Sequence, residues 1–183
     1  MAEAPSQFGI CCCSAGNHET ENIEYHIQPL ALDAFGEPLH RFPGIAVSVC
    51  NLRPDSHGSS HIAGPSPRDA PAIRPEYLSA ETDKRVAIDS LRHARAVLAT
   101  RRMAEFDPTE IKPGPELTSD AGLLRAAGDV GATIFHPVTP GFGALRVTGA
   151  GQAHSRSWIW RHITFPVPDF GSSSTNTTLR GSL

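Results

Sequence analysis

The chain has 183 residues, enough for one domain with a buried core, and its 16 basic and 19 acidic residues give a formal net charge of -3 at pH 7. Charges of both signs are mixed along the chain, which argues against binding to a nucleic-acid backbone or an anionic membrane. No apolar run reaches the roughly 18 residues of a membrane span, and the first residues lack the pattern of a signal peptide. We therefore expect a cytoplasmic protein without a nucleic-acid partner.

The four cysteines are Cys11, Cys12, Cys13 and Cys50. Adjacent cysteines would strain a mutual disulfide, and no paired Cys-x-x-Cys spacing indicates a structural zinc site. These thiols fit a reducing compartment, and we predict no metal site. A thiol-reactive or metal-binding patch at residues 11–13 is the alternative.

Two strands are predicted in the first third of the chain. Residues 23–32 begin with alternating apolar and polar side chains, the period of a strand with one buried face. Residues 45–52 form a run rich in β-branched side chains, typical of a more buried strand. Turn-forming residues 55–58 follow, so residues 59–62 could form the return arm of an antiparallel pair.

A helix is predicted after a proline-rich connector at residues 64–75, which should run over the surface. Ser79 is a candidate N-cap, because acidic residues follow it in the first turn. Apolar residues then recur at helical spacing from Ala87 to Leu98. His93 lies within this helix, and we interpret it as a solvated or capping histidine rather than a ligand.

A second, shorter helix is predicted from the pair Ser119-Asp120, which can cap it, up to Gly128. The chain then enters residues 133–138, an apolar run of β type that contains His136. Because Pro137 disfavours a helical conformation at the residue before it, His136 is held at a junction.

His136 is the best candidate for a catalytic side chain. The unperturbed pKa of histidine lies near neutrality, so a histidine fixed in an apolar stretch can accept a proton in catalysis. The alternative is a core histidine that hydrogen-bonds to the backbone.

Four separated segments carry a resemblance to a known family. These segments are residues 22–30, 48–58, 71–78 and 133–138. Their order and their approximate spacing resemble the C-terminal half of the glucose-methanol-choline (GMC) oxidoreductases, most closely the choline dehydrogenase branch.

The resemblance implies an α+β substrate-binding domain, an antiparallel sheet with helices on one side. We expect it to cover residues 8–138, after an N-terminal extension at residues 1–7. Residues 139–183 form a divergent tail that we expect to be partly flexible.

The family oxidises an alcohol by passing hydride to bound FAD, and His136 matches the histidine that accepts the hydroxyl proton. The resemblance thus implies a small alcohol as substrate, FAD as cofactor and His136 as proton acceptor. Arg53 lies in another matching motif and could bind an anion or, as we rather expect, serve as a structural hydrogen-bond donor.

Three features depart from the family pattern. The Gly-x-Gly-x-x-Gly loop that receives the FAD diphosphate does not occur in these 183 residues. The segment after residue 138 is shortened. The nearest match to the second catalytic motif is residues 172–176, which offers Ser174, and Asn176 two residues later, as weak candidates. Trp158 and Trp160 could form an aromatic cage for a substrate or pack in a sheet.

We interpret the chain as the substrate-domain portion of an FAD-dependent alcohol oxidoreductase that is inactive alone. A separately encoded flavin domain could complete it, because no residue of this chain can be assigned to binding the dinucleotide. The alternative is a non-catalytic binding or interaction module, or a decayed fragment.

Overall fold

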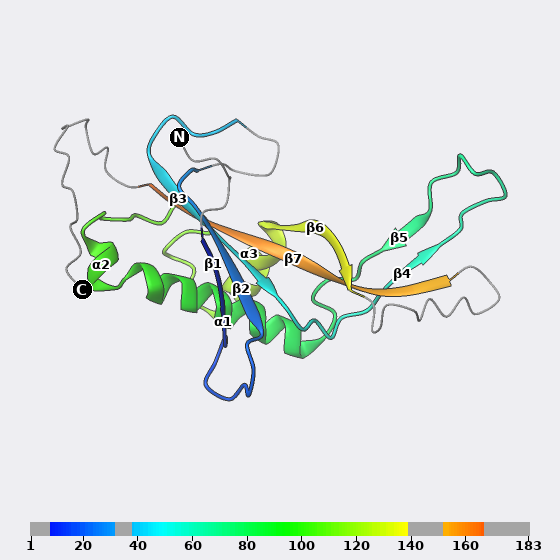
Figure 1. Ribbon diagram of the computed structural model, residues 1–183, viewed down its shortest axis with the longest axis horizontal. Helices are drawn as coiled ribbons and strands as arrows, with labels where there is room; N and C mark the ends of the chain where they lie inside the picture. The colour runs from blue at the N-terminus through cyan, green and yellow to red at the C-terminus, as the bar shows by residue number, and fades with distance from the viewer. Residues whose placement is uncertain (1–7, 32–37, 139–151, 167–183) are drawn as a thin grey trace, which may run out of the picture.

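A computed structural model describes residues 8–31, 38–138 and 152–166, and for residues 134–138 and 152–166 it describes the backbone. Seven strands form one sheet in the order β1-β2-β3-β7-β4-β5, with β6 also pairing with β7 (Figure 1). All of these pairings are antiparallel. The strands are β1 (Phe8–Cys12), β2 (Ile23–Gln28), β3 (Gly44–Asn51), β4 (Gly58–His61), β5 (Ala72–Arg74), β6 (Gly131–Val138) and β7 (Gln152–Pro166).

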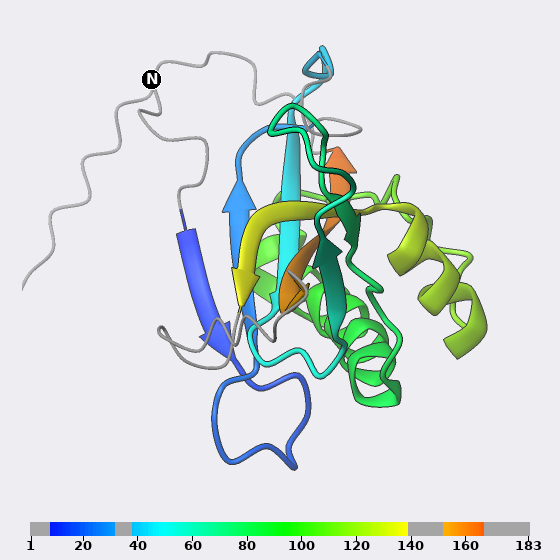
Figure 2. The ribbon, with the colours of Figure 1, turned by 90° about the vertical axis from the view of Figure 1, so that its right-hand side faces the viewer.

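The helices are α1 (Glu81–Leu98), α2 (Arg101–Ala104) and α3 (Asp120–Asp129). The long helix α1 packs along β3, and α3 packs on α1. Figure 1 shows α1 running along one side of the sheet, and Figure 2 shows β1, β2 and β3 side by side. The predicted α+β class, an antiparallel sheet with flanking helices, is confirmed.

The core lies between the sheet and α1. Alternate residues of β2, Ile23 and Tyr25, are buried against it, as the two-residue period predicts. Glu24 and His26 alternate with them and occupy the opposite face, where Nε2 of His26 lies 3.1 Å from Oε1 of Glu24. The buried side chains that complete the core are those of Val47, Val49, Val86, Ala87, Ile88, Leu91, Ala94, Leu98, Leu123 and Ala127.

Strand β7 lies in the middle of the sheet. Its C-terminal half pairs with β3, where Cys50 is opposite Trp160, and its N-terminal end pairs with β4, where Gly58 is opposite Ser155. The sequence-based expectation that residues 59–62 pair back onto the preceding strand is therefore wrong. Strand β4 pairs with β5 and β7 because the chain leaves the sheet between β3 and β4.

The start of α1 also differs from the prediction. Its N-cap is Ala80, not Ser79, and no side chain caps it. Instead, the hydroxyl of Ser56 accepts a 3.1 Å hydrogen bond from the backbone N–H of Ala80. The cap of α3 is as predicted, because the Ser119 hydroxyl accepts from the backbone N–H of Gly122.

The predicted proline-rich connector contains one short strand, β5, whose residues are exposed. This agrees with an edge position, which tolerates neighbouring prolines. Within the described ranges, every helix is too short or too polar to cross a bilayer.

Candidate functional site

His136 lies in the most irregular part of β6. Thr133 is paired with Ile159 of β7, and the next registered pair joins Pro137 to Ser157. Three residues of β6, 134–136, are thus opposite the single residue Trp158. Such bulges interrupt the ladder, bend the strand and are frequent next to active sites. The backbone around His136 is therefore displaced from regular pairing.

The pairing of β7 with β3 and β4 is also interrupted over this stretch. Cys50 is opposite Trp160 and Gly58 is opposite Ser155, so seven residues, 51–57, pass alongside only four residues of β7. The excess residues leave the sheet as a loop toward α1. The pairings of β7 with β3, β4 and β6 therefore all depart from regularity around Trp158.

The buried carboxylate of Asp83 in α1 holds this loop. Its Oδ1 accepts hydrogen bonds of 2.9 Å from Nδ2 of Asn51 and from the backbone N–H of Asp55. Its Oδ2 accepts one of 2.7 Å from the backbone N–H of Ser56. A negative charge in the first turn of a helix is also favoured by the helix dipole. Loop 51–57 is therefore tied to the helix start by several charge-assisted bonds.

A further bond joins the loop to α1 at the surface. The hydroxyl of Thr82 donates a 2.7 Å hydrogen bond to Oδ2 of Asp55. Together with the Ser56 contact to Ala80, this fixes both sides of the loop. The conformation of the loop is thus preorganised, which is the condition for a loop to present a side chain accurately.

Three residues of this loop are exposed, Arg53, Asp55 and His57, and Asp55 is the one that accepts the bond from Thr82. Nε of Arg53 donates a 3.3 Å hydrogen bond to the carbonyl of Glu21, so Arg53 braces the loop against the chain that enters β2. This agrees with the expected structural role of Arg53. His57 is exposed and directly precedes Gly58, the residue paired with β7. It lies at the β4 end of the loop.

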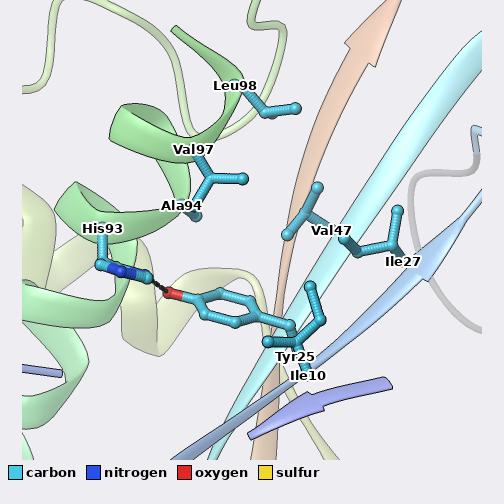
Figure 3. Close-up of a pocket in the computed structure, with 8 residues that line it drawn as sticks. All are labelled: Ile10, Tyr25, Ile27, Val47, His93, Ala94, Val97 and Leu98. Carbon is cyan, nitrogen blue, oxygen red and sulfur yellow. Dashed lines mark hydrogen bonds between the residues drawn. The ribbon is translucent and has the colours of Figure 1, made fainter. Parts of the chain in front are cut away.

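A small cavity lies elsewhere, between the sheet and α1 (Figure 3). It is lined by apolar side chains and has a volume of about 40 Å³, far below the roughly 300 Å³ of a typical ligand pocket. Figure 3 shows the Tyr25 hydroxyl directed at His93, with 2.9 Å to its Nδ1. The same hydroxyl donates to the carbonyl of Ser90 at 3.0 Å.

His93 is therefore half-buried and bonded to Tyr25, rather than solvated or capping as predicted. The two rings also stack, with centroids 5.6 Å apart. Burial, and to a smaller extent the charge of the Cys12 thiolate, raises the pKa of Tyr25. This pair joins β2 to α1 within the domain core.

The four cysteines all lie among the described residues and form no disulfide there, and Cys50 is buried. Burial, followed by the charges of Cys13 and Cys11, raises the pKa of the Cys12 thiol. A raised pKa lowers the fraction of reactive thiolate, which argues against an activated nucleophile at this position. No cluster of metal-ligating side chains occurs among the residues that the structure describes.

The second-motif candidates Ser174 and Asn176 lie outside the described residues. Trp158 and Trp160 lie in β7, whose backbone is described. Sequence reasoning missed the role of Asp83, which it treated only as an acidic first-turn residue. The available signal was an aspartate at helical spacing with the buried residues Ala87 and Leu91, and so on the buried face of α1.

The comparisons with known proteins agree with this fold. Residues 54–141 match the C-terminal model of a family described as GMC oxidoreductase. An alcohol dehydrogenase [acceptor] from Pseudomonas putida is 31% identical over 125 residues, which cover 68% of this chain and 23% of that protein. An oxygen-dependent choline dehydrogenase from Staphylococcus aureus (strain JH9) is 34% identical over 123 residues, or 66% of this chain and 22% of that protein.

The aligned part thus spans less than a quarter of the length of each of these relatives. The matched residues include α1, α3 and β6 together with most of loop 51–57. The family match and the antiparallel α+β fold lead to the same assignment, and the chain belongs to the GMC oxidoreductases through the C-terminal domain of that family.

Proposed function

We propose that this chain provides the alcohol-binding domain of an FAD-dependent oxidoreductase that acts on the CH–OH group of its donor. His136 is the proton acceptor. The observation that carries the proposal is the bulge of β6 at residues 134–136, which takes the segment of His136 out of regular pairing. The names of the two relatives, an alcohol dehydrogenase and a choline dehydrogenase, support an alcohol as substrate.

The described residues do not fit the diphosphate of FAD. Helix N-termini bind phosphates when their backbone N–H groups are free and no negative charge competes. The first turn of α1 carries the Asp83 carboxylate, and that of α3 carries Asp120, which is paired with Arg85 and Arg92. A diphosphate would meet a carboxylate at either end. We therefore assign FAD binding to a separate flavin domain, in which FAD would supply the hydride acceptor.

In this proposal, the chain contributes the side chain that accepts a proton from the substrate. A neutral imidazole at His136 accepts the proton of the substrate hydroxyl, which makes the carbon a better hydride donor.

The test uses the full chain joined to the flavin-containing remainder of the Pseudomonas putida relative. We expect alcohol to bleach the flavin absorption band anaerobically, and His136→Gln to slow this step by about 100-fold or more. The control is His61→Gln, in β4. A near-normal rate of flavin reduction in H136Q, with the flavin still bound, would contradict the role of His136. A flavin spectrum in the 183-residue chain alone would contradict the assignment of FAD to another domain.

A further inference from the structure

The feature that leads further is the hairpin of β4 and β5, residues 58–74, which we call the arm. Figure 1 shows the arm running away from α1 and α3, beside the N-terminal end of β7. Every residue from 65 to 74 is exposed, including all three residues of β5. The outer part of the arm is therefore open to solvent.

The arm is nevertheless held in shape at its base and at its tip. At the base, a Cβ at position 58 would overlap the carbonyl oxygens of Arg74 and Pro75, so the two strands approach closely at Gly58. At the tip, the backbone N–H of Ser66 donates a 3.3 Å hydrogen bond to Oδ2 of Asp69, whose own N–H donates to the Ser66 carbonyl at 3.1 Å. A preorganised element of this kind loses little conformational entropy when it docks on a partner.

Two isoleucines are the most exposed large apolar side chains of the arm, Ile62 at 75% and Ile73 at 65%. Ile73 is opposite Ser60, two residues before Ile62, so the two-residue period of an extended chain places both isoleucines on one face. A hairpin without a packed face is only marginally stable in water, and apolar side chains that gather on an exposed surface mark interaction sites. We therefore expect the isoleucine face to be covered by a partner.

The base of the arm adjoins the end of β6 along β7. Val138, two residues after His136, is opposite Arg156. The preceding residue of β7, Ser155, is opposite Gly58. A base that takes the hydroxyl proton and a flavin that takes the hydride act on the same CH–OH group, with reacting atoms about 3–3.5 Å apart. A flavin domain that reacts with this substrate must therefore cover the segment of His136, next to which the arm begins.

We propose that the isoleucine face of the arm docks on an apolar surface of the flavin domain, beside its flavin site. This inference rests on the proposed function, which requires the flavin domain at the segment of His136. The length of the relatives supports this partner, because more than three quarters of each lies outside the part aligned with this chain.

The experiment compares amide hydrogen exchange in the full chain alone and in the chain joined to the flavin-containing remainder of the Pseudomonas putida relative. We expect the amides of the arm to exchange at least about tenfold more slowly in the joined enzyme, because docking shields them from water. Those of β1, at the opposite end of the strand order, should exchange at the same rate in both proteins. The double variant Ile62→Lys with Ile73→Lys should lose the protection, since docking would bury two ammonium groups.

The matched control is Phe8→Lys. Phe8 is 66% exposed, about as much as Ile73, but it lies in β1. F8K should keep both the protection of the arm and the rate at which alcohol reduces the flavin, whereas the double variant should lower that rate at least about tenfold. All three replaced side chains are exposed, so both variants should fold, which circular dichroism will verify.

The outcomes separate the two proposals. Docking of the arm is overturned if its amides exchange equally in both proteins, or if the double variant keeps the protection. It is also overturned if protection appears in the chain alone and grows with concentration, which would place a second copy on the arm. Flavin reduction that depends on His136 while the arm stays unprotected would overturn this inference alone. A protected arm in a joined enzyme whose flavin alcohol does not reduce would overturn the proposed function and leave the docking surface.

Discussion

Oδ2 of Asp83 accepts a 2.7 Å hydrogen bond from the backbone N–H of Ser56, a residue 27 positions earlier in the chain. The contact joins the first turn of α1 to the loop between β3 and β4. It also lies within a buried group of donors, because Asn51 and Asp55 bond to the same carboxylate. Asp83 therefore fixes the start of α1 to the loop between β3 and β4.

We expect Asp83→Ala to lower the free energy of unfolding by about 3 kcal/mol, since it leaves buried N–H donors without an acceptor. Urea denaturation followed by circular dichroism measures the change. The control is Asp89→Ala in the same helix, because Asp89 has no side-chain hydrogen bond within the described ranges. Equal stability of D83A and D89A would show that the carboxylate does not hold the loop.

Tyr25 gives a prediction at high pH. Burial, and then the nearby Cys12, raises the pKa of its phenol above the usual value of about 10. A group with a raised pKa in the folded state contributes stability that is complete below the unfolded pKa and is lost as the pH rises above it. The free energy of unfolding should therefore fall above about pH 10, because the phenol of Tyr25 ionises there in the unfolded chain but stays protonated in the folded one.

The variant Tyr25→Phe tests this directly. At neutral pH we expect it to cost about 1 kcal/mol, because the bond to the Ser90 carbonyl is lost. Above about pH 10 the difference from the unmodified chain should narrow, since Phe has no proton to lose. Tyr77→Phe, which alters the other tyrosine, should keep the high-pH loss. Parallel pH curves for Y25F and the unmodified chain would refute the explanation.

Asp120 gives a prediction at low pH. Hydrogen bonds from Arg92, at 2.6 Å, and then from Arg85, at 3.0 Å, lower the pKa of its carboxyl. A lowered pKa contributes stability that is present above the unfolded value, near 3.8, and is lost as the pH falls through the folded one. The carboxylate should therefore stay ionised to lower pH than an unpaired aspartate.

Carboxyl NMR titration of Asp120 measures this shift. Arg92→Gln should raise the pKa more than Arg85→Gln, in the order of the two hydrogen bonds. Arg125→Gln, within α3 itself, should leave the titration of Asp120 nearly unchanged. A larger effect of R85Q than of R92Q would reverse the assigned order.

The local elements were predictable from the sequence, because they depend on short-range periodicity and turn chemistry. The alternation in β2 and the Ser119 cap of α3 are examples. The cap of α1 was not, because Ser56, far from it in the chain, takes the place of a local side chain. The exposed histidine expected at position 93 is likewise half-buried, because Tyr25 reaches it from another element.

The pairing of β7 is the largest part of the fold that local sequence patterns could not predict. Its partners β3, β4 and β6 come from distant parts of the chain, and no short-range signal fixes such a register. The candidate His136 was found from its motif, whereas the bulge of β6 around it depends on the register with β7.

The central place of β7 has a consequence for how the domain is made. Strands β2 and β3 and helix α1 all precede β7 in the chain and can assemble before it is synthesised, but β3, β4 and β6 gain their common neighbour only when residues 152–166 emerge. Pairings so distant in sequence form slowly, and unpaired edges are sites of aggregation. Folding of this domain is therefore completed only after β7 has been synthesised, and a nascent chain that stops before β7 exposes unpaired strand edges to which chaperones bind.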